Sequence, residues 1–322
     1  MTRSDIRSLL RFDEYVEIVE DAFRLYAEGK TLKPASMHVD SAGGEFHVKA
    51  GGLRLDKWFF GLKVNGGFFH NMERFGMANI QGAILLCEGE TGYPLAVMDS
   101  GEITTKRTGA AAAIAAKYLA RPDSSVVTIC GCGTQGLIQL RAMKSVLPLK
   151  KAYVFDVDEK KAQSFAREMS AQLAVPIVPT SSLGDTTKQS DVYVTCTPSR
   201  QFYLTSQDVS AGTFIAAMGA DSPDKQELDP ELLKSNKVVV DLLDQCSQAG
   251  ELHHAIEQGM AKEDVYGELS EIITGKKSGR TSEEEITIFD ATGTALQDVA
   301  AASAIYQRAL HLGIGQELDL LK

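Results

Sequence analysis

The glycine-rich turn GCGTQG at residues 131–136 constrains this chain more than any other stretch. An apolar run at residues 126–130 leads into it, a helical pattern follows, and a second apolar run ends at Asp156. The order of strand, tight turn, helix, strand and acid is typical of a dinucleotide-binding unit. The alternative is a glycine turn in an ordinary α/β domain.

The glycines and the acid of this stretch each have a physical task in a dinucleotide site. Gly131 permits the tight turn, Gly133 lets the backbone approach a pyrophosphate, and Gly136 allows the helix to pack closely on the strand. The helix N-terminus then presents N–H groups to the phosphates. Asp156 follows Gly136 by 20 residues, where the ribose-binding acid of this motif belongs.

Asp156 also predicts which cofactor is used. A carboxylate at this position accepts hydrogen bonds from the ribose 2′-OH and repels a 2′-phosphate. Asp158 adds negative charge where an enzyme specific for NADP would prefer arginine. We therefore expect NAD(H) rather than NADP(H).

Length and charge exclude several classes of protein. The chain has 322 residues, which suggests two domains. Its net charge of -10, without a basic tract, argues against a nucleic-acid partner. We find no run of about 18 apolar residues that would span a membrane, and the first residues lack the apolar core of a signal peptide.

The cysteines predict a reducing compartment. Most of the five lie inside apolar runs, which is typical of buried free thiols and favours the cytoplasm. Cys130 and Cys132 are two residues apart, which is not a metal-binding spacing, and we predict no metal site.

Beyond Asp156 the pattern alternates between strands and helices, which predicts a parallel sheet with right-handed crossovers. A helix is expected at residues 159–173. The expected strands are residues 175–179, 191–198, 213–219, 237–241 and 285–290.

Ligands of such sheets bind beyond the carboxyl ends of the strands. The residues expected at those ends are Gly131, Asp156, Thr197, Asp221 and Thr292. Their shared location favours one site. Asp221 is a candidate catalytic acid or base, with a turn or N-cap aspartate as the alternative.

The first third of the chain has a different pattern. Residues 33–97 contain short runs typical of a mostly antiparallel sheet, between amphipathic helices expected at residues 12–26 and 103–120. Lys63 lies within an apolar strand, where burial would make it a usable base; the alternative is a lysine on a solvent face. A closing helix at residues 296–312 is expected to return to this domain.

Arg107 falls in the first turn of the helix expected at residues 103–120. A positive side chain there opposes the helix dipole. A bound anion, such as a substrate carboxylate or a cofactor phosphate, would explain it. The alternative is a solvated arginine.

Several stretches together resemble the ornithine cyclodeaminase/mu-crystallin family. They cover most of the chain in the right order, and together they are highly specific. They are GLK at 61–63, GYPLAVMD at 92–99, RTGA at 107–110, GCGTQ at 131–135, TP at 197–198, GAD at 219–221, KQEL at 225–228, FDATG at 289–293 and QD at 297–298.

The resemblance implies an α/β fold: a Rossmann-type parallel-sheet NAD-binding domain plus a mostly antiparallel α+β domain that binds substrate and forms a homodimer. We expect the Rossmann domain at residues 119–294 and the other at residues 1–118 and 295–322. By the matching motifs, Lys63 is the general acid/base and Asp221 handles water or amine at the imine. The implied cofactor-binding set is Arg107, Gly131, Gly133, Thr134, Gln135, Asp156, Thr197, Thr292 and Gly293.

One strand departs from the family pattern. Relatives often carry an arginine and a Met-Pro-Ala segment before the strand lysine, whereas here the arginine position holds His47 and Lys49 replaces the methionine. A regular strand places both on one face. We predict that His47, Lys49 and Arg107 bind the substrate, with Lys49 acting as a point charge for a carboxylate.

The resemblance implies NAD-dependent oxidation of an α-amino acid at Cα through an imine. Water then yields a keto acid and ammonia, as in alanine dehydrogenases, or the side-chain amine of ornithine attacks and proline forms. The alternatives are a ketimine (cyclic imine) reductase and a non-catalytic mu-crystallin-like binding protein.

Overall fold

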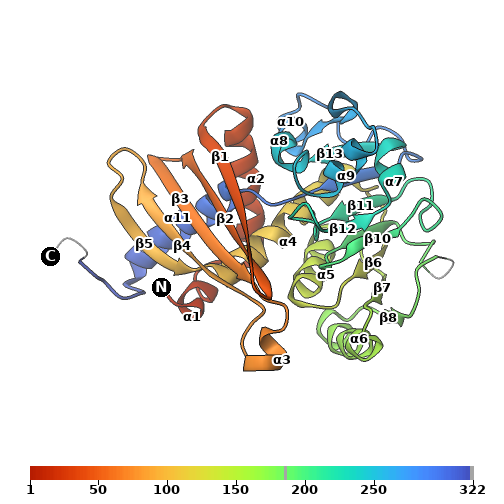
Figure 1. Ribbon diagram of the computed structural model, residues 1–322, viewed down its shortest axis with the longest axis horizontal. Helices are drawn as coiled ribbons and strands as arrows, with labels where there is room; N and C mark the ends of the chain where they lie inside the picture. The colour runs from red at the N-terminus through yellow and green to blue at the C-terminus, as the bar shows by residue number, and fades with distance from the viewer. Residues whose placement is uncertain (185–186, 320–322) are drawn as a thin grey trace. The chain divides into compact units, whose positions relative to one another are not determined.

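The computed structural model describes residues 1–184 and 187–319. The chain forms two compact units, which are coloured by residue number in Figure 1. The first comprises Met1–Arg107 and Thr294–Lys322, and the second comprises Thr108–Gly293. Each has its own sheet, antiparallel in the first and parallel in the second, so the predicted α/β fold class is confirmed. Among the described helices, none has the length and apolar character needed to cross a membrane.

The sheet of the first unit has five antiparallel strands in sequence order. They are β1 (Thr31–Ser41), β2 (Gly44–Arg54), β3 (Trp58–Gly67), β4 (Ile80–Glu88) and β5 (Pro94–Asp99). The helices of this unit are α1 (Arg3–Arg7), α2 (Phe12–Ala27), α3 (Asn71–Phe75) and α11 (Ala295–Leu312). As expected, the closing helix α11 returns to this unit, where it packs against the sheet and α2.

The two faces of this sheet differ in what covers them. Side chains alternate along a strand, so one face collects every second residue. The face against α11 carries buried apolar side chains: Leu53, Phe59, Ile84, Leu86 and Met98. The opposite face carries exposed apolar side chains: Met37 (57%), Val39 (43%), Phe46 (39%), Val64 (37%) and Val97 (56%). We call this second set the open face.

Helix α11 approaches the sheet closely because β3 has a glycine under it. A Cβ built on Gly61 would lie 2.6 Å from Cγ2 of Val299, so no larger residue fits without a shift. This approach brings Asp298, the neighbour of Val299, within reach of β3.

The second unit has an eight-stranded sheet whose paired strands all run parallel, as predicted. Its spatial order is β14-β13-β15-β11-β9-β6-β7-β8. The strands are β6 (Val126–Cys130), β7 (Lys151–Phe155), β8 (Ile177–Thr180), β9 (Val192–Thr195), β11 (Phe214–Ala217), β13 (Lys237–Val240), β14 (Gly267–Glu268) and β15 (Thr287–Asp290). The predicted domain boundaries stay a prediction.

The helices of the second unit are α5 (Thr134–Val146), α6 (Glu159–Leu173), α7 (Pro230–Lys234), α8 (Leu243–Cys246), α9 (Glu251–Glu257) and α10 (Leu269–Ile273), with a short 3₁₀ turn at Lys262–Asp264. The parallel pair β10 (Arg200–Leu204) and β12 (Gln226–Leu228) forms a separate small sheet that the sequence analysis misses.

Helix α4 (Ser100–Leu119) corrects one expectation. It begins three residues before the predicted start at residue 103, so Arg107 lies on its third turn and not its first. Contrary to the expectation from the sequence, Arg107 does not oppose the dipole at the helix N-terminus. The buried partners of Arg107, described below, account for its position instead.

Candidate functional site

The carboxyl edge of the parallel sheet gathers the residues that the sequence places there. Gly131 follows β6, Asp156 follows β7, Thr197 follows β9, Asp221 follows β11 and Thr292 follows β15. The chain runs from β6 outward to β7 and β8, then crosses to β9 on the other side of β6. That reversal is the switch point at which such sheets bind their ligands.

The turn after β6 has the geometry that its glycines predict. Gly131 has a φ of +106°, which an L side chain rarely adopts. A Cβ on Gly136 would collide with the carbonyl oxygen of Gly131 and touch Ile129 on β6, so α5 packs directly on the strand. The sequence therefore requires glycine here for a turn and a close approach.

The N-terminus of α5 fits a phosphate group. Nothing lies within 4 Å of a Cβ built on Gly133, so the space in front of the turn is open. Thr134 and Gln135 begin the helix, and Gln135 Oε1 is buried without a hydrogen-bond partner among the described residues. Open space at a helix N-terminus suits a phosphate of a dinucleotide. The Gln135 oxygen is an acceptor, so its partner would be a donor such as a ribose hydroxyl.

Asp156 is held at the end of β7. Its carboxylate accepts from the N–H groups of Cys132 (2.8 Å) and Asp158 (3.0 Å), and Lys161 Nζ lies 2.9 Å away. Burial disfavours the charge, but Lys161 and these N–H groups outweigh it and lower the pKa of Asp156 below its usual value. Asp156 is therefore ionised at neutral pH. Asp158 caps α6 by accepting from Lys160 and Lys161.

Glu227 organises the loops after β9 and β11. It accepts from the N–H (2.6 Å) and hydroxyl (2.7 Å) of Thr197, from the Tyr203 hydroxyl (2.7 Å) and from the N–H of Gly219 (3.0 Å). Burial raises the pKa of Glu227 and these donors partly offset it. Glu227 belongs to a stretch that the sequence analysis quotes without giving it a role.

Asp241 fixes the loop after β15 by accepting hydrogen bonds from it, as Glu227 does for the loops after β9 and β11. It accepts from the N–H of Gly293 (2.6 Å) and the hydroxyl of Thr292 (3.3 Å). Gln245 Nε2 donates to the Thr292 hydroxyl (2.7 Å) and to the Gly293 carbonyl (2.8 Å). Thr292 and Gly293 are thus fixed in place, and their predicted contacts with the cofactor stay a prediction.

Asp221 is partly exposed at this edge. Lys225 Nζ lies 2.7 Å from Asp221 Oδ1, four residues along the chain in the loop after β11. The pair holds the Asp221 side chain near the loop that Glu227 fixes. Its predicted role at the imine stays a prediction.

The first unit contains a second cluster, built around Asp298 of α11. Lys63 Nζ of β3 lies 2.6 Å from Asp298 Oδ2, and Arg107 Nε of α4 donates to Asp298 Oδ1 at 3.0 Å. The three side chains are 6% exposed or less. The structure thus decides between the two alternatives for Lys63 in favour of burial. The buried ion pair with Asp298 also accounts for the position of Arg107.

The charges and the burial in this cluster shift the pKa values of both Lys63 and Asp298. Burial, reinforced by Arg107 and opposed by Asp298, lowers the pKa of Lys63 to about 7. Burial works against ionisation of Asp298 too, but Arg107 and Lys63 outweigh it and hold the pKa of Asp298 below its usual value. Lys63 can therefore bind or release a proton near neutral pH while Asp298 stays charged.

Lys49 and Gln297 complete this cluster. Lys49 pairs with Lys63 across β2 and β3, so both side chains lie on the face that α11 covers, and Lys49 is 5% exposed. Gln297 Oε1 accepts from Arg107 Nη1 at 3.0 Å. The amide nitrogen of Gln297 is buried and has no acceptor among the described residues. Such a donor beside several cations favours an anionic ligand.

Two residues of this cluster are missed by the sequence analysis. Gln297 and Asp298 are quoted there only as part of the resemblance, without a role. The signal that could have found them is an acid and an amide in the first turn of a helix that is otherwise apolar and rich in small residues.

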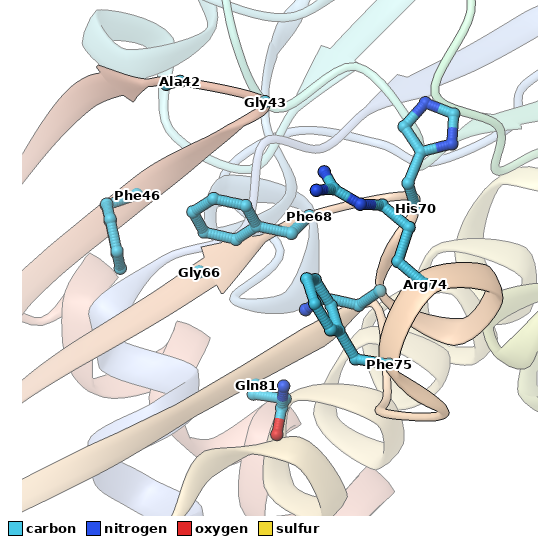
Figure 2. A pocket seen from close by; sticks show the side chains of 10 residues that line it. Ala42, Gly43, Phe46, Gly66, Phe68, His70, Arg74, Phe75 and Gln81 are labelled. Atoms are coloured by element: carbon cyan, nitrogen blue, oxygen red, sulfur yellow. The ribbon is translucent and has the colours of Figure 1, made fainter.

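A separate hollow of about 480 Å³ lies at the end of the open face. Figure 2 shows Phe46 of β2, Phe68 after β3, and Arg74 and Phe75 of α3 around it. None of the predicted site residues lines it.

Comparisons with known proteins show which family this chain resembles over its length. Residues 1–312 match the model of the ornithine cyclodeaminase/mu-crystallin family. The chain is 40% identical over 324 residues to an alanine dehydrogenase of Archaeoglobus fulgidus, covering 100% of this chain and 98% of that protein.

Two solved structures are similar over nearly their whole length. An archaeal alanine dehydrogenase dimer with bound NAD has a TM-score of 0.93 at 40% identity, covering 100% of this chain and 98% of that one. The Δ¹-pyrroline-2-carboxylate reductase of Thermococcus litoralis, in complex with NADH and L-proline, has a TM-score of 0.94 at 33% identity, covering 99% of both chains. The predicted NAD(H) cofactor agrees with the cofactors in both. This chain belongs to the ornithine cyclodeaminase/mu-crystallin family.

Proposed function

We propose that the chain is an NAD-dependent enzyme that oxidises a small α-amino acid at Cα, and in reverse reduces the corresponding imine. The observation that carries this proposal is the cluster of Lys63, Asp298 and Arg107. A buried lysine with a pKa of about 7, held at 2.6 Å by a charged carboxylate, is suited to general acid/base work near neutral pH.

The charges of the cluster favour a substrate that carries a carboxylate. The positive charges of Arg107, Lys63 and Lys49 all lower the pKa of Asp298. The bonds that fix Arg107 use Nε and Nη1, so we assign Nη2, together with the Gln297 amide nitrogen, to the substrate carboxylate. Two fixed donors would orient Cα for reaction.

Lys63 then accepts the proton that the substrate ammonium group loses, because hydride leaves Cα only when the amine is neutral. Asp298 stabilises the lysine ammonium that forms. The Gly131–Gln135 turn and Asp156 would hold NAD, which would supply the hydride acceptor. Asp221 directs water to the imine carbon, and the products are a 2-oxo acid, ammonium, NADH and a proton.

Reduction of a cyclic imine is the second candidate. It is supported by the similarity to a Δ¹-pyrroline-2-carboxylate reductase with NADH and L-proline. The same cluster serves that reaction in the opposite direction, with the Lys63 ammonium donating the proton to the imine nitrogen.

The assay that tests this proposal incubates the protein with NAD and a panel of amino acids and follows NADH and ammonia. Both products from alanine or another small amino acid support oxidative deamination. Ammonia and proline from ornithine, without net NADH, indicate cyclisation. Oxidation of NADH by a cyclic imine indicates the reductase. No turnover in any arm, with NAD still bound, contradicts the proposal and favours a binding protein.

We also propose that a second copy of the chain covers the open face. Met37, Phe46 and Val97 are among five large apolar side chains left at least 37% exposed on one sheet face, and a contiguous apolar patch on a soluble protein marks an interface. The similar archaeal alanine dehydrogenase is a dimer.

Sedimentation velocity tests the dimer. Val97→Asp is expected to shift the chain toward a monomer, because a buried unpaired charge is costly. Val178→Asp, at a position 38% exposed on the second unit, is the control and should leave the dimer intact. A wild-type monomer at micromolar concentration contradicts the proposal.

A further inference from the structure

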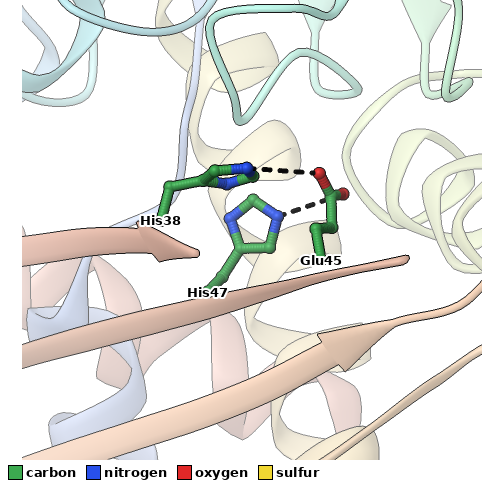
Figure 3. Close-up of side chains that lie close together, drawn as sticks. All are labelled: His38, Glu45 and His47. Carbon is green, nitrogen blue, oxygen red and sulfur yellow. Dashed lines mark ion pairs between the residues drawn. The ribbon is translucent and has the colours of Figure 1, made fainter. Parts of the chain in front are cut away.

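The tip of the β1–β2 hairpin carries His38 and Glu45, which the proposed chemistry does not use, and His47, whose predicted contact with the substrate stays a prediction. His38 and His47 are direct partners across the two strands, and Glu45 lies two residues before His47 on the same face. Figure 3 shows both rings turned toward the Glu45 carboxylate. The three side chains are 29%, 12% and 11% exposed, in the order His38, His47, Glu45.

The contacting atoms converge as metal ligands do. His47 Nε2 lies 3.1 Å from one Glu45 oxygen and His38 Nε2 lies 3.8 Å from the other. One ligand atom from each residue falls within 4.8 Å of the other two. Ligand atoms around a tetrahedral zinc ion are about 3.3 Å apart, so small side-chain rotations would bring all three onto one ion.

We propose that His38, Glu45 and His47 form a site for a first-row divalent metal ion, with Zn²⁺ as the best fit. Two imidazoles and one carboxylate are a donor set that zinc accepts, with the fourth position open to water. Asp40, whose Oδ1 lies 3.1 Å from His38 Nε2, adds negative charge at the mouth of the site. The cysteine spacing predicts no metal site, whereas these ligands are two histidines and a glutamate on paired strands.

The strand pairing shows what a metal ion would connect at this site. The turn at Ala42 and Gly43 joins β1 to β2, and a metal ion would tie the two strands together just before it. His47 pairs with Asn65 of β3, and Lys49 pairs with Lys63 on the same face. The ion would thus lie two residues along β2 from the cluster around Asp298, about 7 Å at the usual rise per residue.

A second group of possible ligands supplies a matched control. His253, His254 and Glu257 lie within one turn of α9. There the Nε2 of His254 already contacts the carbonyl of Lys225 at 2.9 Å, and Glu257 is 63% exposed. The ligand atoms of this group also lie within 4.8 Å of one another, but the group is more exposed than the hairpin site and one of its nitrogens is already engaged, so it is the weaker candidate.

The experiment is a Zn²⁺ titration of the full chain, stripped with a chelator and returned to buffer, by calorimetry. Co²⁺ absorption serves as a second measurement that reports the ligand set. We expect one Zn²⁺ to bind, with the affinity reduced by at least about tenfold in His38→Gln and in His47→Gln. His253→Gln should bind as the wild type does.

Thermal unfolding gives a readout that is independent of turnover. Zn²⁺ should raise the Tm of the wild type and of His253→Gln, but not that of His47→Gln, since a ligand stabilises only the state that binds it. Circular dichroism checks that the variants fold, and Glu45→Gln provides a further variant. A wild-type chain that binds no Zn²⁺, or a His47→Gln chain that binds it as tightly as the wild type, overturns the proposal.

Discussion

The two units use buried charge in opposite ways. The cluster of the first unit places Lys49, Lys63 and Arg107 around one acid, Asp298. The second unit buries four carboxylates almost completely, and each accepts from at least two backbone N–H groups. They are Glu227, Asp241, Glu251 and Asp290.

This difference indicates different tasks. Backbone N–H groups satisfy an acid without a counter-charge, so the carboxylates of the second unit fasten loops such as the one at Thr292 and Gly293. Cations that share one acid leave positive potential for an anionic ligand. The first unit therefore uses its buried charges to bind and react with a ligand, and the second uses its buried carboxyl groups to hold its loops in place.

The largest expected effect comes from removing the shared acid. Asp298→Ala leaves Lys63 and Arg107 buried without their common partner, and we expect the free energy of unfolding to fall by about 3–5 kcal/mol. Urea unfolding measures it. Asp13→Ala, which breaks an exposed pair with Arg11, should cost far less, because solvent screens such a pair. An equal loss of unfolding free energy in the two variants would contradict the central role of Asp298 in the cluster.

Next in size is the loss of the proposed base. Lys63→Ala should lower kcat by about a hundredfold or more and leave NAD affinity unchanged, because Lys63 belongs to the first unit. With the wild type, the rate of amino-acid oxidation should rise with pH through about 7, where Lys63 loses its proton. Near-normal turnover of Lys63→Ala would exclude it from the mechanism.

The stability of the two units should depend on pH with opposite signs. Burial raises the pKa of Asp290 to about 7 from 3.8, so the folded chain binds the extra proton between these values and stability falls as pH rises through them. Burial lowers the pKa of Lys63 to about 7 from 10.5, so the unfolded chain binds the extra proton and stability rises from pH 7 to 10.

Unfolding curves at several pH values test this contrast. Each group contributes a slope of up to about 1.4 kcal/mol per pH unit. Asp290→Asn should remove part of the fall between pH 4 and 7, and Lys63→Met part of the rise above pH 7. If both variants keep the wild-type slopes, the buried groups titrate near their ordinary values.

The smallest expected effect concerns cofactor choice. Asp156→Ala removes the acid that repels a 2′-phosphate. The ratio of the Kd for NADPH to the Kd for NADH should therefore fall by about tenfold. Fluorescence titration with both reduced cofactors measures it, and Asp229→Ala, which removes the side-chain cap of α7, serves as the control. Tighter binding of NADPH than NADH by the wild type would contradict the prediction.

Local sequence predicted much of the second unit. Gly131 and Gly136 act through their immediate neighbours, and the helix expected at residues 159–173 has those same bounds in the structure. The strand order around β6 follows from general rules of right-handed crossovers. These features depend on short-range contacts, so a single sequence contains them.

What the sequence by itself determined is therefore the α/β class, the parallel sheet and the position of Gly131, Asp156 and Thr197 at one edge. Only the tertiary structure decided the surroundings of Lys63. Its partner Asp298 lies on the closing helix, 191 residues beyond Arg107, and reaches β3 because Gly61 lets α11 come close. The pKa of a buried group depends on charges that folding brings together, and no local pattern records which ones they are.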